Sequence, residues 1–320
     1  MIPDPAMVER FREDLGAVAP AASILAVAVS GGADSLALLL LAAAAAPGAV
    51  RAATVDHGLR AAGGAEAARV AGYCAALAVP HRILRVAVGR AGAGLQAAAR
   101  EARYAALAAW MRAEGADTLL TAHQADDQAE TLLMRLLRGS GVAGLAGIRA
   151  SAAFPAGGAP ARIARPLLGW RRYELDAIVG AAGLDPVDDP SNRDEAFDRA
   201  RLRRLMAEAT WLDPTPLARS AAALADAEEA LTATADRLYA ERAADEGGAL
   251  RLDPAGLPRE LLRRLVLAAL RHIAPGAAPR GDQLTALLGA LQRGETATLA
   301  GVKCIGGTMW RFAKAPDRRG

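Results

Sequence analysis

The chain has 320 residues, of which 53% are hydrophobic and only 4% aromatic. This composition excludes a disordered chain, and the length exceeds that of one ordinary domain, so we expect two domains. Two cysteines, Cys74 and Cys304, are too few for a disulfide framework or a four-cysteine metal site. The segment 1–20 carries acids and lacks the apolar core of a signal peptide, which favours a cytoplasmic protein with no membrane partner.

The basic residues are almost all arginines. Lys plus Arg number 38 against 35 Asp plus Glu, a net charge of +3, and the lysines are Lys303 and Lys314. Because no lysine precedes Lys303, the first three hundred residues hold neither a Walker-type phosphate loop nor a Schiff-base lysine. A net charge this small does not by itself indicate a nucleic-acid partner.

The first two hundred residues alternate short apolar runs with helical patterns. Strands are predicted over 24–29, 50–55, 82–88, 118–122 and 163–168, and helices over 35–46, 65–78, 95–112, 126–138 and 171–182. The glycine- and proline-rich segment 139–161 is expected to be a loop. This alternation predicts an α/β fold with a parallel, doubly wound, Rossmann-like sheet. Ligands of such sheets bind beyond the carboxyl ends of the strands.

The composition changes after residue 210. A short, arginine-rich helix is predicted over 197–208, longer helices over 216–244, 257–273 and 282–291, and a closing strand pair over 298–312. We therefore expect one domain over residues 1–212 and a smaller, mainly helical domain over 213–320.

The segment Ser30-Gly31-Gly32-Ala33-Asp34-Ser35 ends the first strand and opens a helix. Its glycines permit a tight turn, and its N–H groups with the helix N-terminus favour an anion. The hydroxyls of Ser30 and Ser35 can donate to phosphate oxygens. Asp34 suits a phosphate site only if a cation lies between them, which indicates magnesium. A plain capped turn is the alternative, but the strand–loop–helix context favours a nucleotide site.

Two further polar clusters follow the second and fourth strands. Asp56-His57 either reaches the nucleotide or closes a surface turn. His123, Asp126 and Asp127 stand at a strand end and a helix start, where carboxylates are ordinary capping groups. Beside the Ser30 loop we expect Asp127 or Asp126 to help Asp34 hold magnesium, and His123 to orient or deprotonate a reactant.

The pattern of Ser30 to Ser35 resembles the phosphate-binding loop of the N-type ATP pyrophosphatases of the PP-loop superfamily. Further blocks narrow the resemblance to the tRNA(Ile)-lysidine synthetase family. They are VDHGLR at 55–60, LQAAAREARY at 95–104, TAHQADDQAET at 121–131, LRGSG at 137–141, DPSN at 189–192 and the arginines of 199–203. The resemblance covers about residues 20–210.

This resemblance implies a PP-loop ATP-pyrophosphatase catalytic domain that uses ATP and Mg2+. Its substrates would be tRNA(Ile) with a CAU anticodon and free L-lysine. ATP would adenylate O2 of the wobble cytidine, and lysine would displace AMP to give lysidine. The implied ATP-binding residues are Ser30, Gly31, Gly32, Ala33, Asp34, Ser35, Asp56 and His57; the catalytic residues are Asp34, His123 and Asp127, with Asp34 and Asp127 holding the metal.

Arg100, Arg103, Arg199 and Arg203 are expected to bind tRNA phosphates or seat the anticodon loop, with a solvated basic face as the alternative. The second domain is expected to help select the tRNA, and a homodimer is left open. Two positions depart from the family. Gln124 replaces a second histidine, so His123 alone would carry any base role, and Ala200 replaces an asparagine between Arg199 and Arg203.

Two other functions are weighed against this one. Another PP-loop enzyme such as a tRNA thiolase would usually need paired cysteines, which the chain lacks. A nucleotide sensor without chemistry would not need Asp34, His123 and Asp127 together. ATP–pyrophosphate exchange that depends on tRNA would separate the enzyme from the sensor.

Overall fold

A computed structural model describes residues 2–20, 22–58, 63–86, 95–154, 161–187, 198–209 and 211–316. The chain forms two compact units, one over residues 1–225 and the other over 226–320. The predicted boundary at 212/213 falls just before the helix α9 (Pro214–Arg242), whereas the compact units divide within that helix. No helix in the described part of the chain is long and apolar enough to span a membrane.

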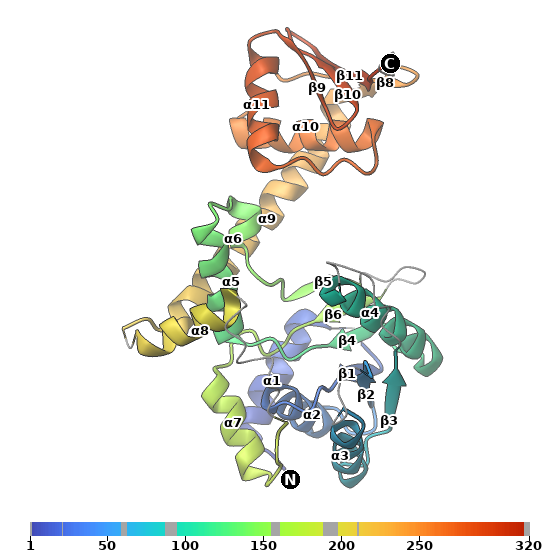
Figure 1. Cartoon of the computed structure of the whole chain (residues 1–320), viewed down its shortest axis with the longest axis vertical. Coiled ribbons are helices and arrows are strands. Elements are labelled where there is room, and N and C mark those ends of the chain that lie inside the picture. Colours follow the sequence, from blue (N-terminus) through green and yellow to red (C-terminus); the bar gives the residue numbers. More distant parts are fainter. Residues whose placement is uncertain are drawn as a thin grey trace. The chain divides into compact units, whose positions relative to one another are not determined.

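The first unit is built on a six-stranded sheet in the order β3-β2-β1-β4-β6-β5 (Figure 1). All its neighbouring strands pair in parallel except the edge strand β5, which runs antiparallel to β6. The strands are β1 (Leu25–Ala28), β2 (Val50–Asp56), β3 (His81–Arg85), β4 (Thr118–Leu120), β5 (Ser151–Ala153) and β6 (Arg162–Ala164). The prediction of a parallel, doubly wound sheet is confirmed.

Helices separate the parallel strands, as the sequence predicts. They are α1 (Pro5–Val18), α2 (Ala33–Ala45), α3 (Gly63–Ala76), α4 (Leu95–Glu114), α5 (Ala125–Leu137), α6 (Val142–Leu145), α7 (Arg172–Ala181) and α8 (Asp198–Glu208). Helix α1 was not predicted, although Asp4 accepts from the Ala6 N–H and Pro5 opens the helix, which are ordinary start signals. The segment 139–161, expected to be a loop, contains α6 and β5.

The two faces of the sheet bury different amounts of apolar surface. Alternate residues of β1 point to opposite faces, so Leu25 and Val27 join one core cluster and Ala26 joins the other. The larger cluster is covered by α1, α2, α3 and α7, and the smaller one by α4 with Phe154. The strands are therefore apolar on both sides, as parallel strands usually are.

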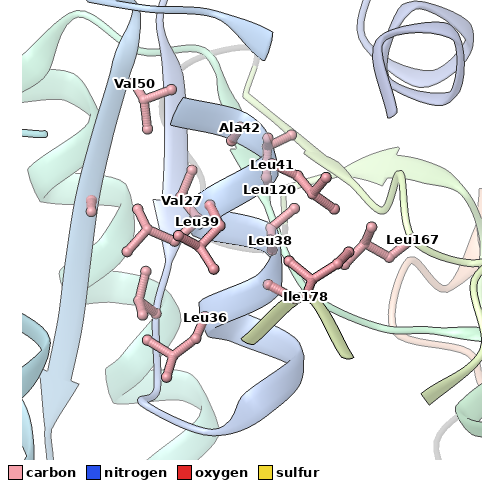
Figure 2. Close-up of a cluster of buried hydrophobic side chains, with 14 of the residues drawn as sticks. Val27, Leu36, Leu38, Leu39, Leu41, Ala42, Val50, Leu120, Leu167 and Ile178 are labelled. Atoms are coloured by element: carbon pink, nitrogen blue, oxygen red, sulfur yellow. The ribbon is translucent and has the colours of Figure 1, made fainter. Parts of the chain in front are cut away.

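Helix α2 is the most deeply buried element of this unit. Its five leucines, Leu36 and Leu38 to Leu41, are at most 1% exposed, and Figure 2 shows several of them between Val27, Leu120 and Ile178. Burying each leucine stabilises the fold by about 2 kcal/mol. A helix that is apolar on every side cannot slide or rotate without exposing a leucine. The residues at its start, Gly32 to Ser35, are therefore held in a fixed position.

Strand register brings the predicted site residues to one edge of the sheet. Ala28 pairs with Ala53, Val27 with Leu120, and Leu120 with Ala164. The segments that follow β1, β2, β4 and β6 consequently leave the sheet together at its carboxyl end, where ligands of this fold class bind. They carry Ser30, His57, His123 and Arg165, respectively.

The second unit combines helices with a five-stranded antiparallel sheet in the order β7-β8-β11-β10-β9. Its elements are β7 (Ala243–Asp245), β8 (Ala249–Leu252), α10 (Arg259–Ile273), α11 (Gly281–Gln292), β9 (Thr296–Leu299), β10 (Val302–Ile305) and β11 (Trp310–Lys314). The predicted helices and the closing strand pair β10–β11 are present. The short strands β7, β8 and β9 complete the sheet around the buried side chains of Trp310 and Phe312.

Candidate active site

The Ser30 loop (residues 30–35) is shaped by one of its own side chains. The Ser35 hydroxyl oxygen accepts the N–H groups of Ser30 (3.1 Å) and Gly31 (3.2 Å) and donates its proton to the Gly32 carbonyl (2.9 Å). Ser35 is buried, whereas Ser30 is exposed. Ser35 therefore acts here as a brace inside the loop, and Ser30 is the more accessible serine, with its hydroxyl 3.2 Å from that of Ser35. Contact of either serine with a phosphate remains a prediction.

Gly31 is required by both conformation and space. Its φ of +93° is one that side-chain-bearing residues rarely adopt, and a Cβ at this position would lie 3.0 Å from a Val187 methyl carbon. The Val187 N–H also donates to the Gly31 carbonyl (2.9 Å). Gly32, the N-cap of α2, offers no side chain to cap the helix. The first amides of α2 are thus oriented for an external anion.

Asp34 stands in the first turn of α2, and its Oδ1 is buried without a hydrogen-bond partner in the described part of the chain. Burial raises its pKa to about 6; the charges of Asp127 and Asp176 add to this rise, and those of Arg172 and Arg203 oppose it. A buried, unpartnered carboxylate oxygen beside a second carboxylate suits a hard cation. No group of three or more metal-ligating side chains occurs among the described residues, so protein atoms alone do not build a closed site.

The start of α5 distinguishes Asp126 from Asp127. The Asp126 carboxylate accepts from the Arg171 guanidinium (3.2 Å) and from the Arg172 N–H (3.0 Å), which ties α5 to α7. Asp127 Oδ2 accepts the Gln124 N–H (3.2 Å), and burial raises the Asp127 pKa. Because Asp127 also acts electrostatically on Asp34, it is the better placed of the two for a shared cation. Gln124 serves as the N-cap, accepting the Asp126 N–H.

His123 is a neutral imidazole near pH 7. Its Nδ1 lies 3.2 Å from the Thr121 hydroxyl. Burial lowers its pKa to about 4, and four arginines lower it further in the order Arg165, Arg199, Arg100, Arg103. So low a pKa makes His123 a weak proton acceptor, which favours the orienting role over the base role. The four cations around it also mark this edge of the sheet as attractive to anions.

Arg199 and Arg203 converge on a residue that the sequence reasoning missed, Glu130. Its carboxylate, 2% exposed, accepts from Arg199 Nε (3.0 Å) and from Arg203 through both Nε (2.7 Å) and Nη2 (3.1 Å). Arg172 Nη2 lies 4.0 Å from the same carboxylate. Glu130 lies one turn after Asp127, and this i, i+3 spacing could have revealed it. The tRNA role of Arg199 and Arg203 remains a prediction.

Asp56 and His57 occupy the end of β2. Asp56 Oδ1 accepts the Gly58 N–H (2.9 Å) and so closes a local turn. His57 Nδ1 is buried without a partner among the described residues, and burial followed by the Arg103 charge lowers its pKa. Leu59, Arg60 and the segment 189–192, which belong to the sequence motifs, lie outside the described residues.

Arg100 and Arg103 are placed by an aromatic side chain. Their guanidinium carbons lie 5.0 Å and 5.4 Å from the ring centre of Tyr104, which meets Phe154 edge to face. Both arginines act on His123, so they belong to the same edge of the sheet as the Ser30 loop. Arg135 of α5 instead donates from Nη1 to the Gly144 and Gly147 carbonyls (2.6 Å and 3.0 Å).

Comparison with known proteins identifies the class of protein to which the chain belongs. A family model described as a PP-loop domain matches residues 6–209. The U34-tRNA thiolase NcsA of Methanococcus maripaludis, solved with its [4Fe-4S] cluster, covers 71% of this chain and 78% of its own length at a TM-score of 0.53. With 15% identity, that likeness shows the fold alone. The first unit is thus a PP-loop domain.

Relatives of higher sequence identity indicate the family within this class. The tRNA(Ile)-lysidine synthase of Novosphingobium aromaticivorans is 47% identical, over 97% of this chain and 94% of that protein. That of Zymomonas mobilis is 45% identical, over 94% and 91%, respectively. The chain therefore belongs to the tRNA(Ile)-lysidine synthase family. The expected resemblance is confirmed, and a thiolase is the less favoured alternative.

Proposed function

We propose that this protein ligates lysine to C2 of the wobble cytidine, position 34, in the CAU anticodon of tRNA(Ile). ATP adenylates the cytidine O2 with release of pyrophosphate, and the lysine ε-amine then displaces AMP to form lysidine. The change converts the codon read by the tRNA from AUG to AUA. The observation that carries the proposal is the unpartnered Asp34 carboxylate oxygen beside the uncapped amides of α2.

The phosphates of ATP fit the Ser30 loop. The amides of the first turn of α2 and the exposed Ser30 hydroxyl would bind them, while Ser35 keeps the loop in shape. Asp34 and Asp127 would hold Mg2+, which in related chemistry is usually bound by one or two carboxylates together with substrate phosphates. When bound, the ion would neutralise the charge that develops on the departing pyrophosphate.

His123 would position the reacting groups rather than remove a proton. Its neutral imidazole can donate or accept one hydrogen bond, and the surrounding arginines would draw the nucleotide and the tRNA to it. Asp56 and His57 lie at the neighbouring strand end, where the sequence places part of the ATP site. Arg100, Arg103, Arg199 and Arg203 would bind tRNA phosphates.

The second unit would help select the tRNA. Cross-strand register places Arg251 of β8 opposite Arg311 of β11, and Lys303 of β10 is exposed on the same side of the sheet. Glu246 lies near both arginines, at 3.5 Å and 3.6 Å. A face with these cations and one carboxylate suits a phosphate backbone. Because the substrate is tRNA, we expect the enzyme to act in the cytoplasm.

Mass analysis of the tRNA tests the function. Unmodified tRNA(Ile) with a CAU anticodon, incubated with the protein, ATP, Mg2+ and lysine, should gain the mass of one lysine less one water at the wobble cytidine. Omission of lysine should leave no stable product while pyrophosphate is still released. An oxygen-to-sulfur exchange would instead identify a thiolase, and ATP binding without tRNA-dependent pyrophosphate exchange would identify a sensor.

A further inference from the structure

A second group of arginines lies beside His123 and differs from the group around Glu130. Arg165 follows β6, and Arg100 and Arg103 lie on α4; we name these three the unpaired arginine group. All three lower the pKa of His123, so their charges act on one imidazole. Arg100 also lowers the pKa of Arg165, and Tyr104, on which Arg100 rests, belongs to the same core cluster as Ile163, two residues before Arg165.

Arg165 is the best-defined member. Its Nε is buried without a partner in the described part of the chain, and its hydrogen bond is a donation from Nη1 to the Arg149 carbonyl (2.6 Å). Burial and the Arg100 charge both lower its pKa. A guanidinium has five donors, and a buried one is normally matched to a carboxylate. In the described residues no carboxylate is paired with Arg165, so most of its donors remain available.

Arg100 and Arg103 show the same lack of a carboxylate partner among the described residues. They rest on the Tyr104 ring, which is buried, and Tyr104 rests on Phe154. A ring face attracts a guanidinium weakly and leaves its N–H groups free to bind another molecule. Tyr104 thus positions two cations without neutralising either.

Holding several cations together without an anion costs stability, because the like charges repel and one of them is partly desolvated. Ligand-binding sites often carry such a cost, and the bound ligand restores the lost stability. Guanidiniums bind phosphate groups through paired N–H···O bonds, which carboxamides or neutral bases cannot reproduce. A carboxylate would bind in the same way, but ATP and tRNA, two of the three proposed substrates, both carry phosphates, so we expect the missing partner to be a phosphate group.

We propose that Arg165, with Arg100 and Arg103, forms a phosphate-binding subsite beside His123 that is distinct from the Glu130 cluster. The subsite would take a phosphate of either the nucleotide or the tRNA backbone close to the reacting cytidine. This inference rests on the proposed function and adds Arg165, which neither the sequence motifs nor the family likeness assigns. Its position after β6 puts it at the same sheet edge as the Ser30 loop.

The test replaces Arg165 with methionine, which keeps the side-chain length and removes the charge. Arg162→Met is the matched control, because Arg162 is exposed on the same strand and bonds Ser151 (2.9 Å). Two binding measurements are made with each variant, one with Mg-ATP alone and one with unmodified CAU tRNA alone. Thermal unfolding without ligand is measured alongside.

Arg165→Met is expected to weaken one of these affinities at least tenfold. Loss confined to Mg-ATP identifies a nucleotide phosphate. Loss confined to tRNA, with the slope of log affinity against log salt reduced by about one, identifies a backbone phosphate. Loss of both places the subsite between them. The control should retain both affinities.

Wild-type affinity of Arg165→Met in both measurements overturns the inference. If the methionine variant does not fold, Arg165→Gln, which keeps a donor for the Arg149 carbonyl, takes its place with the same outcomes. The mass assay on the wild type separates the two proposals. A wild type that makes lysidine while the variant binds normally overturns only the subsite, and a wild type that makes no lysidine overturns the function.

Discussion

Two groups of arginines, each with a member that lowers the pKa of His123, differ in how their charge is balanced. Arg172, Arg199 and Arg203 gather around the buried carboxylate of Glu130, with Asp127 and Asp34 close by. Arg100, Arg103 and Arg165 gather around an aromatic ring and a carbonyl, with no carboxylate partner in the described part of the chain. The carboxylates of Glu130 and Asp127 offset part of the charge of the first group, whereas no carboxylate in the described part of the chain pairs with the second. The difference teaches that equally basic side chains can support the fold or oppose it.

The largest expected effect concerns Asp34. Asp34→Asn should lower the rate of tRNA-dependent ATP–pyrophosphate exchange roughly a hundredfold or more, because a carboxamide cannot replace a charged ligand of the metal. Asp117→Asn is the control, since Asp117 is exposed at the amino end of β4, away from the site edge. A normal exchange rate in Asp34→Asn, with an unchanged magnesium requirement, would remove Asp34 from the metal site.

The second largest expected effect concerns the Glu130 carboxylate, which Arg199 and Arg203 share. Glu130→Gln should lower the free energy of unfolding by about 2 kcal/mol, because it leaves Arg199 and Arg203 uncompensated beside a buried amide. The partial exposure of both arginines keeps the effect below that of a fully buried pair. Denaturant unfolding measures it. Arg165→Met should show no such loss; equal destabilisation by the two changes would erase the distinction between the groups.

The smallest effect is a dependence on pH. His123 has a pKa of about 4 in the folded protein and 6.5 when unfolded, so the unfolded chain takes up its proton first as the pH falls. The stability from this residue is complete above pH 6.5 and decreases steadily as the pH falls from 6.5 to 4. His123→Asn should flatten this part of the stability curve.

The titration of His123 also distinguishes the two arginine groups. Loss of the Arg165 charge should raise the pKa of His123 and narrow the pH range over which stability falls. Arg199→Met should raise it less, because Arg165 is the stronger of the two influences. NMR titration of the imidazole measures both. A larger rise in Arg199→Met would mean that the Glu130 cluster does not neutralise its arginines.

Much of the fold could be predicted from local sequence. Apolar runs bounded by glycine or proline gave the strands β1, β2, β4 and β6 and the helices between them, because a doubly wound sheet repeats one short-range pattern. Helix α1 was missed because its apolar residues Val8 and Phe11 become meaningful only against α2. The strands β5, β7, β8 and β9 pair antiparallel with their neighbours, so they stand outside the strand–helix alternation that indicated β1, β4 and β6.

Part of the candidate site could also be predicted from the order of strands and helices along the chain. The Ser30 loop and the start of α5 follow strand ends, so their meeting could be inferred from strand order alone. The sequence could not tell that Asp126 bonds Arg171 while the charge of Asp127 raises the pKa of Asp34, since both depend on how the helices pack. Nor could it show that Glu130 holds Arg199 and Arg203, about seventy residues later. Arg165 has no motif around it and became a candidate only through its unpartnered Nε.

The Ser35 hydroxyl, closed upon two amides and a carbonyl of its own turn, has a consequence for turnover. Because the hydrogen bonds that shape this loop lie within the loop itself, ligand binding costs little ordering entropy. Release of the ligand likewise leaves these internal hydrogen bonds in place. With the Ser30 loop as the proposed ATP-binding segment, the enzyme would bind the next ATP without waiting for this backbone to refold.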